Sequence, residues 1–123
     1  VIDRTLVLFE AHFKRNYLHV SDSAQAFLHS IENYQTMVGE PYNVGLSEAN
    51  LSKKDLCEAI QKQVPDFRYV ISEIGKDPDQ RNYIVSNDKI ESSGFKTQMG
   101  LDEGIKELVK GFQIVRRNQY ANI

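Results

Sequence analysis

The stretch that decides the fold is Arg15-Asn16-Tyr17-Leu18-His19-Val20-Ser21-Asp22-Ser23-Ala24-Gln25-Ala26. Its first half alternates in the manner of a short strand, and its second half opens a helix. Beyond that start, apolar side chains recur with the spacing of one helical face, at Ala24, Phe27, Leu28 and Ile31. The stretch therefore predicts a strand that runs directly into an amphipathic helix, which is expected to end near residues 33–34.

Polar residues mark where that helix begins. Ser21 or Asp22 is expected to cap it, and Asp22 with Gln25 three residues later fits a capping box, which pairs backbone donors at a helix start. Arg15 stands one strand's length before the cap. An arginine in that place suits an anionic ligand.

Length and composition limit the class of protein to which this chain can belong. With 123 residues, 41% of them apolar and 26% charged, the chain is one domain or part of one. A formal net charge of −2 argues against a nucleic-acid or membrane-surface partner, because both favour a basic patch. The sequence has neither a signal-peptide pattern nor an apolar run near the ~18 residues of a membrane helix. A single cysteine, Cys57, fits a reducing cytoplasmic setting.

Further strands are expected at residues 6–9, at 41–46, where a brief strand closes on Gly45, and at 67–72. Ser52 is the expected cap of a helix that Pro65 stops, and Cys57, on that helix, is expected to be a small core residue. Residues 74–83 form a polar loop by composition.

Two helices are expected after the loop. Ser86 begins a short one that ends at Gly94, a residue suited to the left-handed conformation. Asp102 caps a long one, with basic residues in its later turns at Lys106, Lys110, Arg116 and Arg117. Its apolar face consists of Ile105, Leu108, Val109, Phe112 and Val115.

The predicted fold class is mixed α/β (α+β), with about four helices and short strands. The strand at 42–44 lies between two helices, as in a parallel crossover, and is expected to join a larger sheet.

The ordered motifs resemble one family. The pattern Arg-(Asp/Asn)-aromatic-aliphatic-His-Val-x-Asp-x-Ala-x-Ala of residues 15–26 is similar to the opening of the C-terminal region of extended short-chain dehydrogenase/reductases, the NAD-dependent sugar-nucleotide epimerases and dehydratases. Asn16 stands where the family more often has Asp, and Thr97 where it usually has proline. The other matching motifs, in family order, are Tyr42-Asn43-Val44-Gly45, the helix start at 51–56, the arginine loop at 77–90, Gly94-Phe95-Lys96 and Leu101-Asp102-Glu103-Gly104-Ile105.

The resemblance implies a fragment. The seven glycines give no Gly-x-x-Gly-x-x-Gly turn for a dinucleotide, and no tyrosine has a lysine four residues later. Residues 1–123 are therefore expected to be a single C-terminal substrate-binding domain that lacks the N-terminal Rossmann half, binds no cofactor and is inactive alone. NAD(P) would serve the parent enzyme, an epimerase (isomerase), a dehydratase (lyase) or a reductase.

The resemblance also implies site residues. In the family the two matching arginines, here Arg15 and Arg81, reach the diphosphate of the sugar nucleotide, and guanidinium forks suit phosphate oxygens. Asn82 and Tyr83 would add hydrogen bonds or stacking, and Asp77 would meet a ribose or a base. The competing interpretation is a pair of ordinary surface arginines.

Other interpretations stay open. His12, His19 and His29 match no zinc spacing, and His19 is expected to pack at the strand–helix junction. A stand-alone, non-enzymatic binding or oligomerisation module derived from the family is the alternative function. Without its Rossmann partner the chain should expose apolar faces, which predicts a homo-oligomer.

Overall fold

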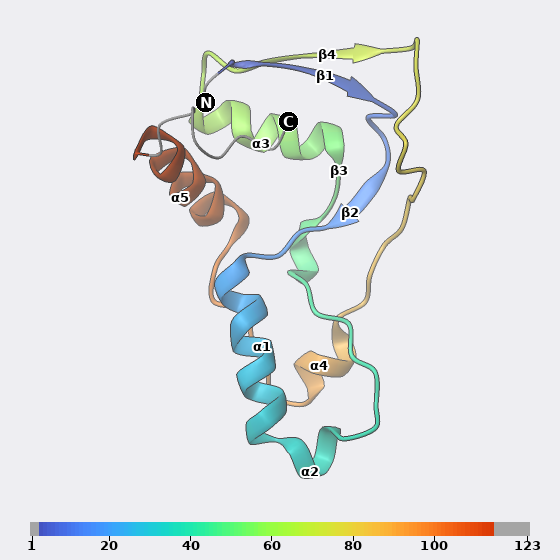
Figure 1. The fold of residues 1–123 in the computed structure, drawn as a ribbon, viewed down its shortest axis with the longest axis vertical. Coiled ribbons are helices and arrows are strands. Elements are labelled where there is room, and N and C mark those ends of the chain that lie inside the picture. Colours follow the sequence, from blue (N-terminus) through green and yellow to red (C-terminus); the bar gives the residue numbers. More distant parts are fainter. Residues whose placement is uncertain (1–2, 115–123) are drawn as a thin grey trace.

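A computed structural model describes residues 3–114, which form a mixed α/β fold, as predicted (Figure 1). Four strands and five α-helices are assigned in that range, so α2 adds one helix to the expected four. In chain order the elements are β1 (Thr5–Phe9), β2 (Lys14–Asn16), α1 (Val20–Glu32), α2 (Tyr34–Met37), a 3₁₀ turn (Ser47–Ala49), β3 (Asn50–Ser52), α3 (Lys53–Gln63), β4 (Arg68–Ser72), α4 (Asp88–Ser92) and α5 (Leu101–Ile114).

The strands form two small sheets. β1 pairs with β4 in parallel, with Leu8 opposite Ile71, and β2 pairs with β3 antiparallel, with Arg15 opposite Leu51. In Figure 1, α3 lies along one face of the β1–β4 sheet. The strands predicted at 6–9 and 67–72 are thereby confirmed.

Two separate clusters make up the core. One joins the β1–β4 sheet to α3, and its buried members are Leu8, Ala11, Cys57 and Phe67. The other lies at the opposite end of the molecule, among α1, α2 and α4, and its buried members are Ala26, Met37, Ile90 and Phe95. Cys57 is thus the small core residue that the sequence predicts.

The beginning of α1 differs from the prediction. His19 is the N-cap, and its ring accepts a hydrogen bond from the amide of Ser21. Asp22 lies inside the first turn and is buried (1% exposed), where its two carboxylate oxygens accept the amides of Gln98 and Met99 at 2.9 and 3.0 Å. The predicted capping box with Gln25 is wrong, because the carboxylate binds a distant segment instead of its own helix.

The predicted apolar face of α1 is exposed. Phe27 and Ile31 are 72% and 70% exposed, Leu28 and Ala24 are also exposed, and the buried residues of the helix are Asp22 and Ala26. The pattern identifies the apolar stripe correctly, but no described residue covers it. The stripe is available for a partner.

The expected strand at 41–46 is also wrong. Residues 41–44 have no assigned secondary structure, although Tyr42 and Val44 pack on the α1–α2–α4 cluster. A strand needs a continuous ladder of backbone hydrogen bonds. Among the described residues this segment has a single such bond to a neighbouring segment, from the amide of Leu46 to the carbonyl of Tyr17 at 3.2 Å.

The helix α3 follows its signals closely. Ser52 is the N-cap, as predicted, and its hydroxyl accepts the amide of Asp55, whose carboxylate accepts the amide of Ser52. This is a complete capping box. The helix ends at Gln63, two residues before Pro65.

The last two helices begin near, but not at, the predicted caps. Asn87, not Ser86, is the N-cap of α4, although the hydroxyl of Ser86 accepts the amide of Asp88 at 3.3 Å. Gly94 has the expected positive φ of 96°.

In α5 the first residue is Leu101, so Asp102 lies in the first turn rather than at the cap. Ile105 is buried, whereas Leu108 and Phe112 are mostly exposed. The predicted positions Val115, Arg116 and Arg117 lie outside the described residues. Among residues 3–114, no helix combines the length and apolarity needed to cross a bilayer.

We expect Gly45→Ala to destabilise the fold. A Cβ on Gly45 would lie 1.4 Å from Oδ1 of Asn16, whose amide donates to the carbonyl of Leu46 at 2.7 Å. Moving Asn16 aside should lower the free energy of unfolding by about 1–3 kcal/mol, measured by urea denaturation. Gly111→Ala is the control, because it meets no atom within 4 Å and lies in α5. It should be neutral or stabilising by up to ~1 kcal/mol; equal losses in both variants would contradict the packing argument.

Candidate functional site: an arginine pair held by a polar loop

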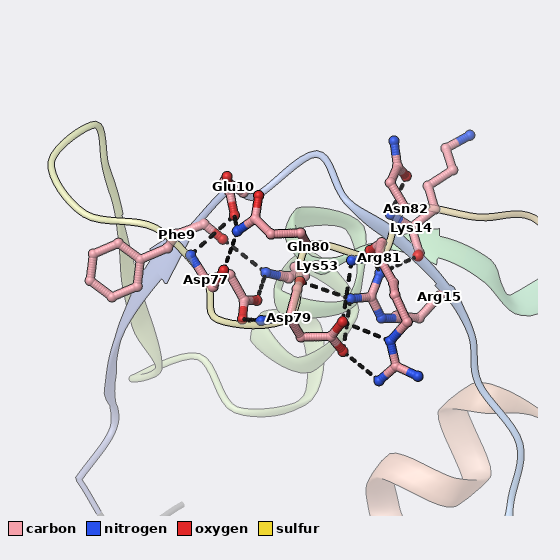
Figure 2. Close-up of polar contacts among 10 residues, drawn as sticks. All are labelled: Phe9, Glu10, Lys14, Arg15, Lys53, Asp77, Asp79, Gln80, Arg81 and Asn82. Carbon is pink, nitrogen blue, oxygen red and sulfur yellow. Dashed lines mark hydrogen bonds and ion pairs between the residues drawn. The ribbon is translucent and has the colours of Figure 1, made fainter.

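The candidate site forms where the loop after β4 returns to β2. The amide of Lys14 donates to Oδ1 of Asn82 at 2.9 Å, and the amide of Tyr83 donates to the carbonyl of Lys14 at 3.4 Å. These bonds hold residues 82–83 beside the strand. Arg15 and Arg81, 66 residues apart in sequence, therefore lie side by side (Figure 2).

Arg15 is the inner member of the pair, with 15% of its side chain exposed. Its Nη1 donates to the carbonyl oxygens of Lys14, at 2.8 Å, and Arg81. Its Nη2 lies 3.2 Å from the carboxylate of Asp79, and its guanidinium lies 5.3 Å from the ring centroid of Tyr83. The residue thus ties the strand to the loop.

Arg81 is the outer member, with 72% of its side chain exposed. Its Nε and Nη2 each donate to one carboxylate oxygen of Asp79 at 2.7 Å, a bidentate pair. These hydrogen bonds hold the pKa of Asp79 far below its usual range, and Arg15 adds to the effect. The same contact raises the pKa of Arg81.

Asp77 lies in the same loop but faces away from the arginines. Its carboxylate pairs with Lys53 at the start of α3, and the ammonium of Lys53 also donates to the carbonyl of Phe9 at 2.9 Å. Glu10 accepts the amide of Asp77 at 3.1 Å and the side-chain amide of Gln80 at 3.0 Å. Asp77 therefore fastens the loop to β1 and α3.

We expect the contribution of Asp77 to stability to depend on pH. The hydrogen bond from Lys53 lowers its pKa, so the contribution is complete above the ordinary aspartate pKa of about 3.9 and is lost as pH falls through the depressed value. Urea denaturation of the parent chain and of Asp77→Asn should show a difference at pH 7 that shrinks toward pH 3. A difference independent of pH would contradict this linkage.

The structure brings four of the five predicted site residues together. Arg15 and Arg81 both contact Asp79, and Tyr83 packs on the guanidinium of Arg15. Asn82 is bonded to β2, whereas Asp77 belongs to the Lys53 contact. Sequence reasoning missed Asp79, Lys53 and Glu10. The one signal for Asp79 was its position two residues before Arg81, which suits a local ion pair.

Two hollows in the described surface lie elsewhere. A cavity of about 710 Å³ lies between β1, α3 and α5, with a mostly apolar lining that includes Leu6, Leu56 and Phe112. A second, of about 750 Å³, lies beside the start of α3. Neither is lined by Arg15 or Arg81. The arginine pair therefore lies outside both hollows.

The histidines serve structural contacts. His19 lies at the junction of β2 and α1, as predicted, with Nε2 3.2 Å from a carboxylate oxygen of Glu107. His29 Nε2 lies 2.9 Å from the hydroxyl of Ser93 and its ring packs on Phe95. In residues 3–114 no three His, Cys, Asp or Glu side chains are grouped as metal ligands.

Solved structures share this fold. A GalE-like L-threonine dehydrogenase from Cupriavidus necator matches with a TM-score of 0.70 at 18% identity, over 88% of this chain and 36% of that one. TunA, an NAD-dependent NDP-hexosamine 5,6-dehydratase of tunicamycin biosynthesis, matches with a TM-score of 0.68 at 14% identity, over 93% of this chain and 37% of that one. The ADP-L-glycero-D-manno-heptose-6-epimerase of Helicobacter pylori matches with a TM-score of 0.61 at 18% identity, over 90% of this chain and 33% of that one. No protein-family model matches.

The class of fold follows from these matches. This chain has the fold of part of an extended short-chain dehydrogenase/reductase, as the sequence motifs predict. It spans about a third of the length of the structures it matches. At 14–18% identity the likeness establishes the fold alone.

Proposed function

We propose that residues 1–123 form the substrate-binding domain of an NAD(P)-dependent nucleotide-sugar epimerase or dehydratase, and that Arg15 and Arg81 bind the diphosphate of the substrate. The observation that carries the proposal is the convergence of these two arginines from β2 and from the loop after β4. In this proposal the N-terminal Rossmann half, which carries the cofactor and the catalytic dyad, is the partner domain. The domain alone is inactive.

The charges of the site support an anionic ligand. Two guanidinium groups and the carboxylate of Asp79 leave a net charge of +1 at the surface of a chain with formal charge −2. Guanidinium groups suit phosphate because their planar donors match two oxygens at once. Tyr83 beside Arg15 offers an aromatic edge for the nucleotide, and Asn82 positions the loop.

The substrate class is the part of the proposal that the related structures leave open, because they include both a nucleotide-hexosamine dehydratase and a threonine dehydrogenase. Calorimetric titration of the full-length protein with a nucleoside-diphosphate sugar and, separately, with L-threonine distinguishes them. The diphosphate grip predicts saturable binding of the sugar nucleotide. Binding of L-threonine alone would reject the nucleotide-sugar assignment.

A second candidate function, an oligomerisation module, is favoured by the exposed apolar side chains of α1 and its neighbour α2. The large exposed members of this stripe are Val20, Phe27, Leu28, Ile31 and Tyr34. In the first proposal the stripe docks on the Rossmann half; in the second it joins copies of this chain. Light scattering on the 123-residue chain distinguishes them, since a monomer stable on dilution would reject the second. An open reading frame upstream of Val1 that encodes the glycine turn and a Tyr-x-x-x-Lys dyad would favour the first.

A further inference from the structure

We propose that Asp79 is an internal occupant of the arginine pair and that an anionic ligand binds there by displacing its carboxylate. The inference rests on the proposed function for the identity of the ligand group, a diphosphate. Its own claim is that Asp79 masks Arg81 and Arg15 in the free protein.

The geometry of the pair carries this claim. A carboxylate that accepts from Nε and Nη2 of Arg81 occupies the edge of the guanidinium that a phosphate would use for two parallel hydrogen bonds (Figure 2). The same carboxylate lies 3.2 Å from Nη2 of Arg15. Nη1 of Arg15 is already engaged by two carbonyl oxygens. An incoming anion must therefore displace Asp79 to bind the Nε–Nη2 edge of Arg81 and Nη2 of Arg15 together.

Displacement of Asp79 does not require the loop to unfold. The loop is fixed on both sides of this residue, by the Asp77–Lys53 contact and by the Asn82–Lys14 hydrogen bond. Apart from the two guanidinium groups, the Asp79 side chain contacts one other group within residues 3–114, the backbone amide of Arg81, which donates to Oδ1 at 3.2 Å. Rotation of the Asp79 side chain frees the Nε–Nη2 edge of Arg81, while Nη2 of Arg15 keeps its hydrogen bond to the backbone carbonyl of Asp79 at 3.3 Å.

An anionic ligand can replace the Asp79 carboxylate at little cost in free energy. Arg81 is largely exposed, and exposed ion pairs contribute little net stability because water solvates both partners. A diphosphate offers more negative charge and more acceptor oxygens than one carboxylate, so it competes effectively for two guanidinium groups. Asp79 then lowers the affinity without abolishing it.

The test is Asp79→Asn, which keeps the shape of the side chain and removes its charge. Calorimetric titration of the full-length protein with inorganic pyrophosphate should show binding roughly threefold to fivefold tighter than in the parent. Glu73→Gln, the same loss of charge six residues earlier, should leave the affinity unchanged. In an Arg81→Ala background, Asp79→Asn should have a much smaller effect, because the two residues act through one contact.

A second measurement needs no ligand. Phenylglyoxal modifies accessible guanidinium groups, and peptide mapping locates the product. Arg81 should react faster in Asp79→Asn than in the parent, whereas Arg68 should react equally in both. Equal rates at Arg81, or weaker pyrophosphate binding by Asp79→Asn, would overturn the proposal. If no protein binds pyrophosphate, the proposed function fails, and the rate at Arg81 still decides whether Asp79 masks the pair.

Discussion

Asp22→Ala should lower the free energy of unfolding more than any other single substitution considered for this chain. The carboxylate is buried and holds two backbone amides, those of Gln98 and Met99, in the segment between α4 and α5. Removing it leaves both amides without an acceptor and a small void beside α1. Each unpaired donor costs about 1–3 kcal/mol, so we expect a total loss of about 2–6 kcal/mol.

Urea denaturation followed by circular dichroism measures this loss. Asp22→Asn should be nearly as damaging, because a carboxamide has one oxygen acceptor and its amino group faces the second backbone donor. Asp88→Ala is the matched control. Asp88 is exposed in the first turn of α4, where its charge interacts favourably with the helix dipole. Asp88→Ala should lower the free energy of unfolding by no more than ~1 kcal/mol. Equal effects in the Asp22 and Asp88 variants would show that the buried carboxylate does not anchor residues 98–99.

Arg15→Ala should have the second largest effect, seen in ligand binding. In the proposed site this guanidinium is the inner member of the pair and also holds the carbonyl of Arg81 and the carboxylate of Asp79. Its removal takes away charge-assisted contacts worth about 1.5–3 kcal/mol each. Loss of one such contact lowers the affinity for a nucleoside-diphosphate sugar by roughly 10- to 100-fold.

Two comparisons make the effect of Arg15→Ala specific. Arg15→Lys keeps the charge but not the planar fork, so its affinity should fall between those of the parent and the alanine variant. Arg68→Ala removes an arginine whose contacts are the carbonyls of Pro65 and Phe67, away from the site, and should bind like the parent. A loss of affinity in Arg68→Ala equal to that in Arg15→Ala would indicate a nonspecific charge effect.

The parts of the fold that follow local rules were predictable from sequence. The helix α3 carries its cap at Ser52 and its stop at Pro65, and the strands β1 and β4 are short apolar runs, so these elements were identified with their bounds within two residues. Local hydrogen bonding and steric exclusion decide such boundaries. Both depend on residue types near the boundary, so they can be identified from the sequence.

The parts that depend on distant contacts were not predictable in the same way. Asp22 looks like a capping residue until the amides of Gln98 and Met99, 76 and 77 residues away, are found on its carboxylate. The stripe of Phe27 and Ile31 has the spacing of a core face, yet periodicity cannot say whether the covering surface lies in the same chain. The strand expected at 41–46 failed for the same reason, since a strand needs a continuous ladder and Leu46 makes a single such hydrogen bond, to Tyr17.

In the candidate site, too, some residues could be identified from sequence motifs, whereas others depend on distant contacts. The motifs named Arg15 and Arg81, and the structure places them together, but whether they bind a diphosphate stays a prediction. Asp79 was missed because an aspartate two residues before an arginine is common in polar loops. Its contact with Arg15 depends on a loop that returns to β2, and no local pattern encodes that return.

The central claim is that Arg15 and Arg81 together bind the diphosphate of a nucleotide sugar. Calorimetric titration of the full-length protein and of its Arg15→Ala/Arg81→Ala double variant with a nucleoside-diphosphate sugar tests it most directly. We expect saturable binding by the parent and none detectable by a folded double variant. Undiminished binding by the double variant, or no binding by the parent, would contradict it.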